Sequence, residues 1–439
     1  MQSTTYKRYL LILLTVILAF NFVDRLALGI VLQDIKLELS LSDTQLGFLS
    51  GFAFALFYAV MGIPIAAWAD RGNRVTIISF TAALWSVFVA MCGAATSFLQ
   101  LLLVRVGVGV GEAGCIPPAH SLIADNFSRE ERPRAAAIYA LGSPLAFVIG
   151  YALAGWLNQF FGWRWTFVIL GTPGLVLAVL AWLTLKEPRA IRTAQASKQA
   201  RAPALSSREV WLTLAKIRTF RELVFCYSIV FFFGYGVSLW QPAFFIRSYD
   251  LSTGEVGTWF AIIYGLGGIT GTYLGGALAT RFAANNERLQ LRAVAIAKVV
   301  AGTFGCLAYL STNKYLSFSL LALGVLAGAS IYGPILATLQ TLVSERMRAM
   351  AIAIVYFFAN LIGMGLGPLA TGMLSDQFAA AFGPESLRYA LLAISPGFFW
   401  AAWHAWRASN SVTDDLTRAD DYQPSSPEPG GSLRSAAGA

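Results

Sequence analysis

Charged and amide side chains stand inside two long apolar runs of the sequence, and they are the groups best able to do chemistry. One run contains Asn21, Asp24 and Arg25, and another contains Arg105 and Glu112. An ionisable group inside a membrane span costs about 2.5–3.5 kcal/mol on insertion scales, so each one needs a reason. Asp24 lies one helical turn from Asn21, and Glu112 lies two turns from Arg105 on the same helix face. An acid that alternates between an arginine and a proton gives a physical basis for proton coupling, the role we expect of Asp24 and Glu112.

The same charges have two other interpretations. They could form a permanent set of ion pairs that only fixes helix packing, but buried pairs are weak devices for stability. Arg25 and Arg105 could instead hold an anionic head group, because guanidinium groups suit phosphate and carboxylate. We therefore assign Asn21, Arg25 and Arg105 to an ion-pair network or to substrate contact.

Aromatic side chains form a second group of candidates, and they lie in the later part of the chain. A cavity with charges from the first half and apolar bulk from the second would suit an amphiphile with a charged head and an apolar tail. Any one of these aromatics could equally face lipid or anchor a helix at the interface. The cavity candidates are Tyr227, Phe231, Tyr235, Tyr332, Tyr356 and the neighbouring Asn360.

The composition requires lipid as a second solvent. The chain is 57% hydrophobic and only 13% charged, with a mean hydropathy of +0.62, whereas soluble domains carry about 25% charged residues. The net charge of +9 comes from short clusters between apolar runs rather than from a basic stripe, so we expect no nucleic-acid partner. The partners expected are membrane lipid, protons and an amphiphilic small molecule.

Enzyme and cofactor signatures are missing from the sequence. It contains no Walker loop, its two histidines are far apart, and its four cysteines all fall inside apolar runs without ligand spacing. An intramembrane enzyme would need a nucleophile beside a base, and neither Ser143 nor Ser228 has a histidine at a similar depth. We expect no catalytic residue, no metal and no cofactor.

Apolar runs of about 20 residues predict an all-α membrane protein with twelve spans in two related six-helix halves. The halves are residues 1–186 and 220–408, joined by a polar linker at 187–219 and followed by a tail at 409–439 that we expect to be disordered. The predicted spans are 8–32, 44–69, 75–96, 98–122, 134–158, 164–186, 220–246, 254–280, 290–312, 315–343, 348–374 and 386–408.

Basic residues in the loops predict the orientation. They cluster in the loops on the side of both termini, as at Arg71, Arg74 and Arg134, and are sparse on the other side. This imbalance predicts a multi-pass protein of the inner (plasma) membrane with both termini in the cytoplasm. The linker segment 206–219 has apolar residues at helical spacing beside basic ones, which fits either an interfacial helix or a solvated linker.

The segment 66–74, with the sequence Ala-Ala-Trp-Ala-Asp-Arg-Gly-Asn-Arg, resembles the loop motif that follows the second helix in the major facilitator superfamily. The resemblance covers residues 8–408, although Ala66 and Asn73 replace the usual glycines. It implies a cytoplasmic gate in which Asp70 pairs with a basic residue such as Arg134. Arg71 and Arg74 occupy the basic positions of the motif.

More narrowly, the chain resembles spinster-type transporters. The segments that carry this resemblance are 21–25, 105–113, 346–351 and 360–368. It implies a secondary transporter, coupled to protons through Asp24 and Glu112, that moves lysolipids or sphingosine phosphates by alternating access. A proton-coupled transporter of a small organic anion or drug is the alternative. The compact loops suggest a bacterial member, and we expect a monomer.

Overall fold

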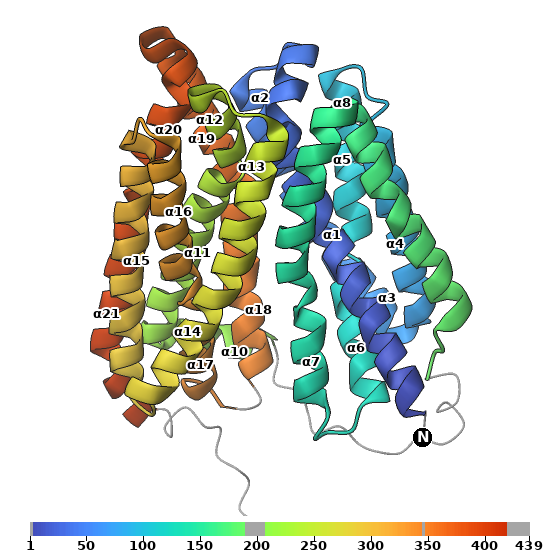
Figure 1. Cartoon of the computed structure of the whole chain (residues 1–439). Helices are drawn as coiled ribbons and strands as arrows, with labels where there is room; N and C mark the ends of the chain where they lie inside the picture. The colour runs from blue at the N-terminus through green and yellow to red at the C-terminus, as the bar shows by residue number, and fades with distance from the viewer. Residues whose placement is uncertain (1–2, 189–206, 345–346, 419–439) are drawn as a thin grey trace, which may run out of the picture.

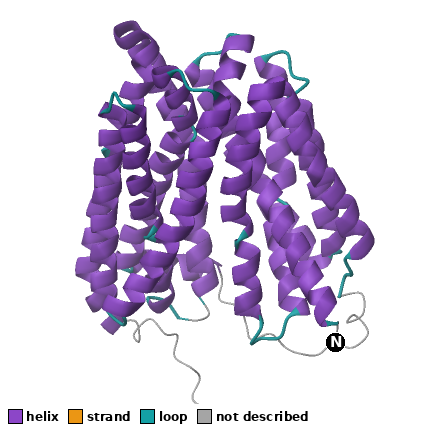
Figure 2. Cartoon of the chain, in the orientation of Figure 1, coloured by secondary structure: helices purple, strands orange, loops and turns teal. Residues whose placement is uncertain are grey.

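The computed structural model describes residues 3–188, 207–344 and 347–418, and within them helices are joined by short loops with no strand (Figure 2). The side chains of Asp70, Ser207, Arg208 and Ala349 are not described. The helices of the first half are α1 (Thr4–Leu39), α2 (Asp43–Gly47), the π-helix η1 (Phe48–Ala53), α3 (Phe54–Arg71), α4 (Arg74–Cys92), α5 (Phe98–Glu112), α6 (Ile116–Asn126), α7 (Arg132–Ala140) and α8 (Gly142–Thr184).

The second half follows α10 (Ser207–Lys216). Its helices are α11 (Arg218–Ser238), α12 (Gln241–Tyr249), α13 (Thr253–Phe260), the π-helix η2 (Ala261–Leu266), α14 (Gly267–Phe282), α15 (Glu287–Leu310), α16 (Lys314–Ala329), α17 (Tyr332–Thr341), α18 (Arg348–Phe358), the π-helix η3 (Ala359–Met364), α19 (Gly365–Phe382), the 3-10 helix η4 (Gly383–Glu385), α20 (Ser386–Ile394) and α21 (Gly397–Thr417).

These helices make the twelve predicted crossings. Ten stretches of the described chain are long and apolar enough to span a membrane, and two of them are far too long for one crossing, with 53 and 68 residues. At 1.5 Å per residue each of those two is at least twice as long as the hydrocarbon is thick. The first turns back at Gly162, where φ is +78°, and the second at Gly383, where φ is +54°. Both angles favour glycine, so each long stretch contains two antiparallel spans.

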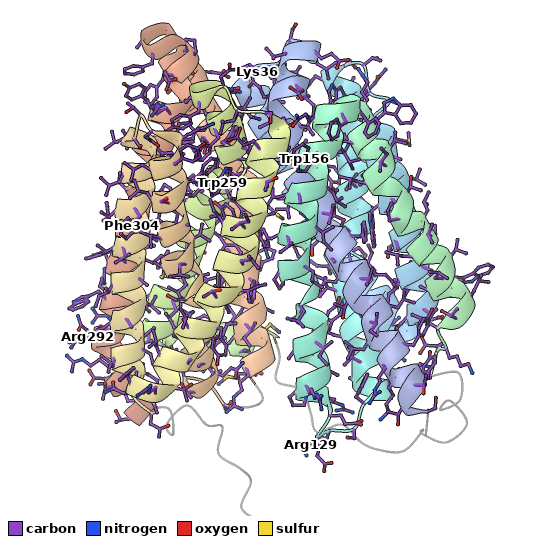
Figure 3. The ribbon with its side chains drawn as sticks, viewed as in Figure 1. Lys36, Arg129, Trp156, Trp259, Arg292 and Phe304 are labelled. Atoms are coloured by element: carbon purple, nitrogen blue, oxygen red, sulfur yellow. The ribbon has the colours of Figure 1, made fainter. Side chains whose placement is uncertain are left out.

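The two halves stand side by side, with the first half on the right of Figure 1 and the second on the left. The N-terminus lies at the lower end, which we call the Arg74 end. The upper end, which we call the Asp43 end, carries Lys36, whereas Arg129 lies at the Arg74 end (Figure 3). Each half has its own apolar core, and the core of the first half extends across the Asp43 end into α12 and α13.

The end of the last helix corrects the boundary predicted at residue 408. Helix α21 continues to Thr417, because Asp415 accepts a hydrogen bond from the Thr219 backbone N–H at 2.7 Å and so caps the start of α11. Residues 419–439, which make up the rest of the predicted tail, lie outside the described chain.

Part of the predicted linker is helical. Val210 and Leu214 of α10 are buried against α11 and its neighbours, while Trp211 is 41% exposed. Contact of this helix with lipid remains a prediction, and residues 189–206 are not described.

Candidate functional site

Two ion pairs between α1 and α5 bring together the four charges singled out in the sequence. Arg105 donates from Nη1 to Oδ2 of Asp24 at 2.8 Å, and Arg25 donates from Nε to Oε2 of Glu112 at 2.6 Å. Asp24, Arg105 and Glu112 are each at most 3% exposed. Both pairs are therefore shielded from bulk solvent. Electrostatic interactions in such a buried site are stronger than in water.

Glycines on α5 let that helix approach its neighbours closely enough to bury the acid. A Cβ at Gly111 would lie 2.6 Å from the backbone nitrogen of Trp85 on α4, and one at Gly109 would lie 3.0 Å from the carbonyl oxygen of Phe54 on α3. Small residues permit such close helix packing in membranes. Glu112 is the last residue of α5, so the same packing fixes the depth of its carboxylate.

Aromatic rings enclose the arginines of this site. The guanidinium of Arg25 lies 4.8, 4.7 and 5.0 Å from the ring centroids of Phe22, Phe54 and Tyr58, and that of Arg105 lies 5.2 Å from Phe54. Cation–π contacts of this kind stabilise a buried guanidinium without neutralising it. The arginines therefore keep full charge toward a carboxylate or a ligand anion.

The site keeps unused hydrogen-bonding capacity. Both amide atoms of Asn21 and Nε of Arg105 are buried and have no hydrogen-bond partner among the described residues, and the carboxyl groups of Asp24 and Glu112 lie within hydrogen-bonding reach of each other. Buried polar atoms are normally satisfied, and groups that are not often have a functional role or bind water or ligand. The arrangement can accept a proton on either acid and can donate to an anion.

A cavity of about 100 Å³ lies between the halves beside these pairs. Arg25 and Arg105 line it from the first half, and Tyr235 and Met364 line it from the second. Arg25 also reaches across, with Nη1 3.7 Å from Sδ of Met364. Met364 is the last residue of η3, the π-helix that also contains Asn360. π-Helical turns inside α-helices are frequent at functional sites.

The aromatic candidates of the second half gather next to this cavity. The ring of Tyr227 lies 4.8 Å from Phe231, 5.5 Å from Tyr356 and 6.3 Å from Tyr332, and Phe231 lies 5.6 Å from Tyr235. Because Tyr235 also lines the cavity, the aromatic cluster and the charged pairs meet there.

The motif after the second helix forms a buried ion-pair cluster within the first half. Arg74 is fully buried and pairs through Nη1 with Asp125 at 2.6 Å and through Nε with Glu187 at 3.1 Å. It also donates to the Ser121 hydroxyl at 2.8 Å. Arg74 thus connects α4 with α6 and with the segment after α8. Asp125 and Glu187 were not among the residues predicted from the sequence.

The remaining gate candidates lie at the same end. Arg71 and Arg134 are exposed at the ends of α3 and α7. The side chain of Asp70 is outside the described set, so its pairing with Arg134 remains a prediction.

A network that was not predicted from the sequence joins the halves at the Asp43 end. Asp43 accepts from Lys36 at 2.6 Å, from Arg247 at 2.8 Å on both of its oxygens, and from the Ser375 hydroxyl at 2.6 Å. The Asp43 backbone N–H donates in turn to Asp376 at 3.0 Å. Arg247, Ser375 and Asp376 belong to the second half, so this network, named the latch below, clamps the two halves.

The acid of the latch stands at a position that recurs in the sequence. The second span opens with Leu41-Ser42-Asp43, and the eighth opens with Leu251-Ser252-Thr253. Ser42 and Ser252 each cap the N-terminus of the helix that follows, so the two segments begin equivalent spans of the two halves. The residue after the serine is an acid, Asp43, in the first half and a threonine, Thr253, in the second.

Comparisons with known proteins agree with this architecture. Residues 14–368 match the Major Facilitator Superfamily. The chain is 35% identical, over 85% of each sequence, to an MFS-type efflux pump of Mycolicibacterium smegmatis. It is 26% identical to the protein spinster homolog 1 of Xenopus tropicalis, over 89% of this chain and 80% of the relative.

A solved structure gives the same result. A bacterial homologue of the human lysosomal transporter spinster, in an inward-facing and unoccupied conformation, has 31% sequence identity and a TM-score of 0.84, over 94% of this chain and 99% of that one. This protein is a multi-pass membrane transporter that belongs to the major facilitator superfamily and is similar to its spinster members.

Proposed function

We propose that this protein is a proton-coupled secondary transporter of an amphiphilic anion, such as a lysophospholipid or a sphingosine-phosphate-like lipid. The observation that carries the proposal is the meeting of two buried acid–arginine pairs with an aromatic cluster at one cavity between the halves. The arginines suit an anionic head, and the aromatic side chains suit an apolar tail.

Proton coupling follows from competition for the arginines. Protonation of Glu112 removes the charge that holds Arg25, and protonation of Asp24 does the same for Arg105. Removing one partner of a buried ion pair costs about 3–5 kcal/mol, which a bound anion offsets by pairing with the released guanidinium. The proton and the anion therefore favour each other's binding, and the loaded site favours rearrangement of the halves.

A small organic anion or drug is the second candidate cargo. The cavity volume of about 100 Å³ favours it, because even a drug-sized ligand usually occupies a pocket of about 300–1,000 Å³, and a lysolipid is larger still. A lysolipid needs the halves to separate further along the aromatic cluster.

We place the Arg74 end in the cytoplasm of a bacterial cell, with both termini there and the protein in the inner membrane as a monomer. Arg71, Arg74, Arg129, Arg132 and Arg134 lie at that end, and cytoplasmic loops carry the excess of basic residues. Closure of the latch at the Asp43 end then corresponds to an inward-facing transporter.

Flux in proteoliposomes tests the proposal. Uptake of a labelled lysophosphatidylglycerol or sphingosine phosphate is measured with a proton gradient imposed and then collapsed. We expect flux to fall with the gradient and to lose its gradient dependence in Asp24→Asn. Asp250→Asn is the matched control, because Asp250 is exposed and its left-handed backbone suits asparagine. Equal gradient dependence in Asp24→Asn and wild type contradicts the coupling, and lipid flux no greater than in empty liposomes contradicts the lipid cargo.

A further inference from the structure

The fourth span is broken immediately after Glu112. Helix α5 ends at Glu112 and α6 begins at Ile116, and between them turn hydrogen bonds join Gly114 to Gly111 and Cys115 to Glu112. Non-helical backbone at membrane depth is tolerated where it is buried in protein or lines a water-filled space. The break is buried in protein, and it places the Cys115 side chain directly after the Glu112 carboxylate on the way to the Arg74 end.

Tyr139 of α7 lies on the far side of this break. Its side chain is 2% exposed, and its hydroxyl is set against a thiol, a weak hydrogen-bonding group. The Cys115 thiol lies beside that hydroxyl. A buried tyrosine normally finds a strong partner for its O–H, so a hydroxyl set against a thiol, between Glu112 and the Arg74 end, requires an explanation.

His120 packs against Tyr139. Its ring stands edge-on to that of Tyr139, with the centroids 5.1 Å apart and an interplanar angle of 81°. His120 is exposed, and the next residue, Ser121, contacts Arg74. From Glu112 to His120 the chain advances eight residues toward the Arg74 end, about 12 Å at helical rise.

We propose that protons reach Glu112 from the Arg74 end along a path formed by His120, Tyr139 and Cys115, with water bridging the intervals between these groups. The inference rests on the proposed proton coupling and adds the residues that supply the proton. His120 takes a proton from solvent and passes it, through bridging water, to the Tyr139 hydroxyl oxygen. The Tyr139 hydroxyl at the same time gives its own proton toward Glu112. Tyr139 is neutral before and after, and the proton ends on the carboxylate while His120 returns to its neutral form.

The residues of the path do not line the cavity between the halves. The groups that face Glu112 are Arg25 and Asp24 from α1, Arg105 from α5 and Tyr58 from α3. They lie on the cavity side, whereas Tyr139 and His120 lie toward the Arg74 end. A proton can therefore arrive while an anion occupies the arginines, as coupled transport of both requires.

A pH jump followed by infrared spectroscopy tests the path without knowledge of the cargo. The protein is reconstituted in liposomes, and the carbonyl stretch of a protonated carboxylic acid is followed after rapid acidification on the Arg74 side. Glu112→Gln identifies the band. Tyr139→Phe and His120→Gln are the test variants. Tyr139→Phe keeps the ring and removes only a hydroxyl whose neighbour is the weakly bonding Cys115 thiol, so we expect it to fold.

We expect both test variants to slow the appearance of the Glu112 band by on the order of 100-fold, the usual contribution of a positioned proton-transfer group. The band's final amplitude and its pH midpoint stay unchanged. His404→Gln and Tyr249→Phe are controls, because His404 pairs with Glu222 and Tyr249 donates to Ser311 in the second half; both should keep the wild-type rate.

Two negative outcomes are distinguishable. A band that persists in Glu112→Gln means that Glu112 does not take up the proton, and it overturns the proposed coupling through this residue together with the path. A band that is lost in Glu112→Gln but appears at the wild-type rate in Tyr139→Phe and His120→Gln overturns the path alone.

Discussion

The latch makes a quantitative prediction about the conformational equilibrium of the protein. Asp43→Asn keeps the size of the side chain but removes its negative charge. Arg247 donates a hydrogen bond of 2.8 Å to each oxygen of that carboxylate. The side chains of Asp43 and Arg247 are only 2% and 10% exposed. The variant therefore weakens a nearly buried contact between the two halves at the Asp43 end.

Only contacts that differ between conformations shift the equilibrium. The pair of Asp43 with Lys36 lies within the first half, so its loss affects both conformations alike. The contacts with Arg247 and Ser375 cross between the halves and are lost when the Asp43 end opens. Hydrogen bonds to charged groups contribute about 1.5–3 kcal/mol each, and asparagine retains part of this. We expect a net change of about 2–3 kcal/mol, or roughly a 30- to 150-fold shift toward the state open at the Asp43 end.

Distance measurements between spin labels provide the assay. Phe160 of the first half and Tyr315 of the second are 68% and 57% exposed near the Asp43 end, and each is replaced by a labelled cysteine after removal of the four native cysteines. We expect a longer distance to gain population in Asp43→Asn. Glu255→Gln is the matched control, because it removes the exposed Glu255–Lys314 pair, which lies within the second half.

An unchanged distance distribution in folded Asp43→Asn would refute the reasoning. It would mean that the apolar and backbone contacts between the halves hold the Asp43 end closed without the charge network. A shift of the same size in Glu255→Gln would also refute it, because that result would trace the change to surface charge rather than to the latch.

Two further predictions concern packing and the Arg74 cluster. Gly155→Ala places a Cβ 2.5 Å from the Thr253 carbonyl oxygen. This overpacking, which costs about 1–3 kcal/mol, should separate the halves at the Asp43 end and lengthen the same distance between the spin labels. Gly276→Ala is the control, because its Cβ meets nothing within 4 Å, and it should leave that distance unchanged. Arg74→Ala removes ion pairs to Asp125 and Glu187 and should lower stability by about 3–5 kcal/mol, measured as a lower Tm in detergent. The Tm of Arg74→Lys should lie between those of Arg74→Ala and wild type, because lysine keeps the charge but lacks the guanidinium fork. An equal Tm in wild type and both variants would contradict the structural role of the cluster.

The sequence predicted the twelve spans and the meeting of α1 with α5, because both follow from local signals. Apolar runs set the number of spans, and Asp24, Arg25, Arg105 and Glu112 are conspicuous because lipid leaves few alternatives for a charge. The sequence did not predict which acid pairs with which arginine. The pairing depends on how the helices are rotated about their axes and on how closely the glycines let them approach.

The latch and the Arg74 partners were not predicted, because their residues look ordinary in sequence. Asp43, Lys36 and Arg247 fall at span ends, where charges are common and need no partner. Asp125 and Glu187 likewise read as loop acids. Only the three-dimensional arrangement of the two halves shows that some of these charges are buried, and burial is what makes them informative.

The contacts between the halves explain how one site can control the conformation of the whole protein. They consist of the latch, of backbones in close approach at glycines such as Gly51 and Gly155, and of Arg25 reaching Met364. Close backbone packing is lost gradually as helices slide, whereas a charge contact is made or broken. Arg25 pairs with a protonatable acid of the proposed site and also reaches across to the second half. A proton on Glu112 therefore changes an interaction between the halves directly, and the latch sets how large that change must be to open the Asp43 end.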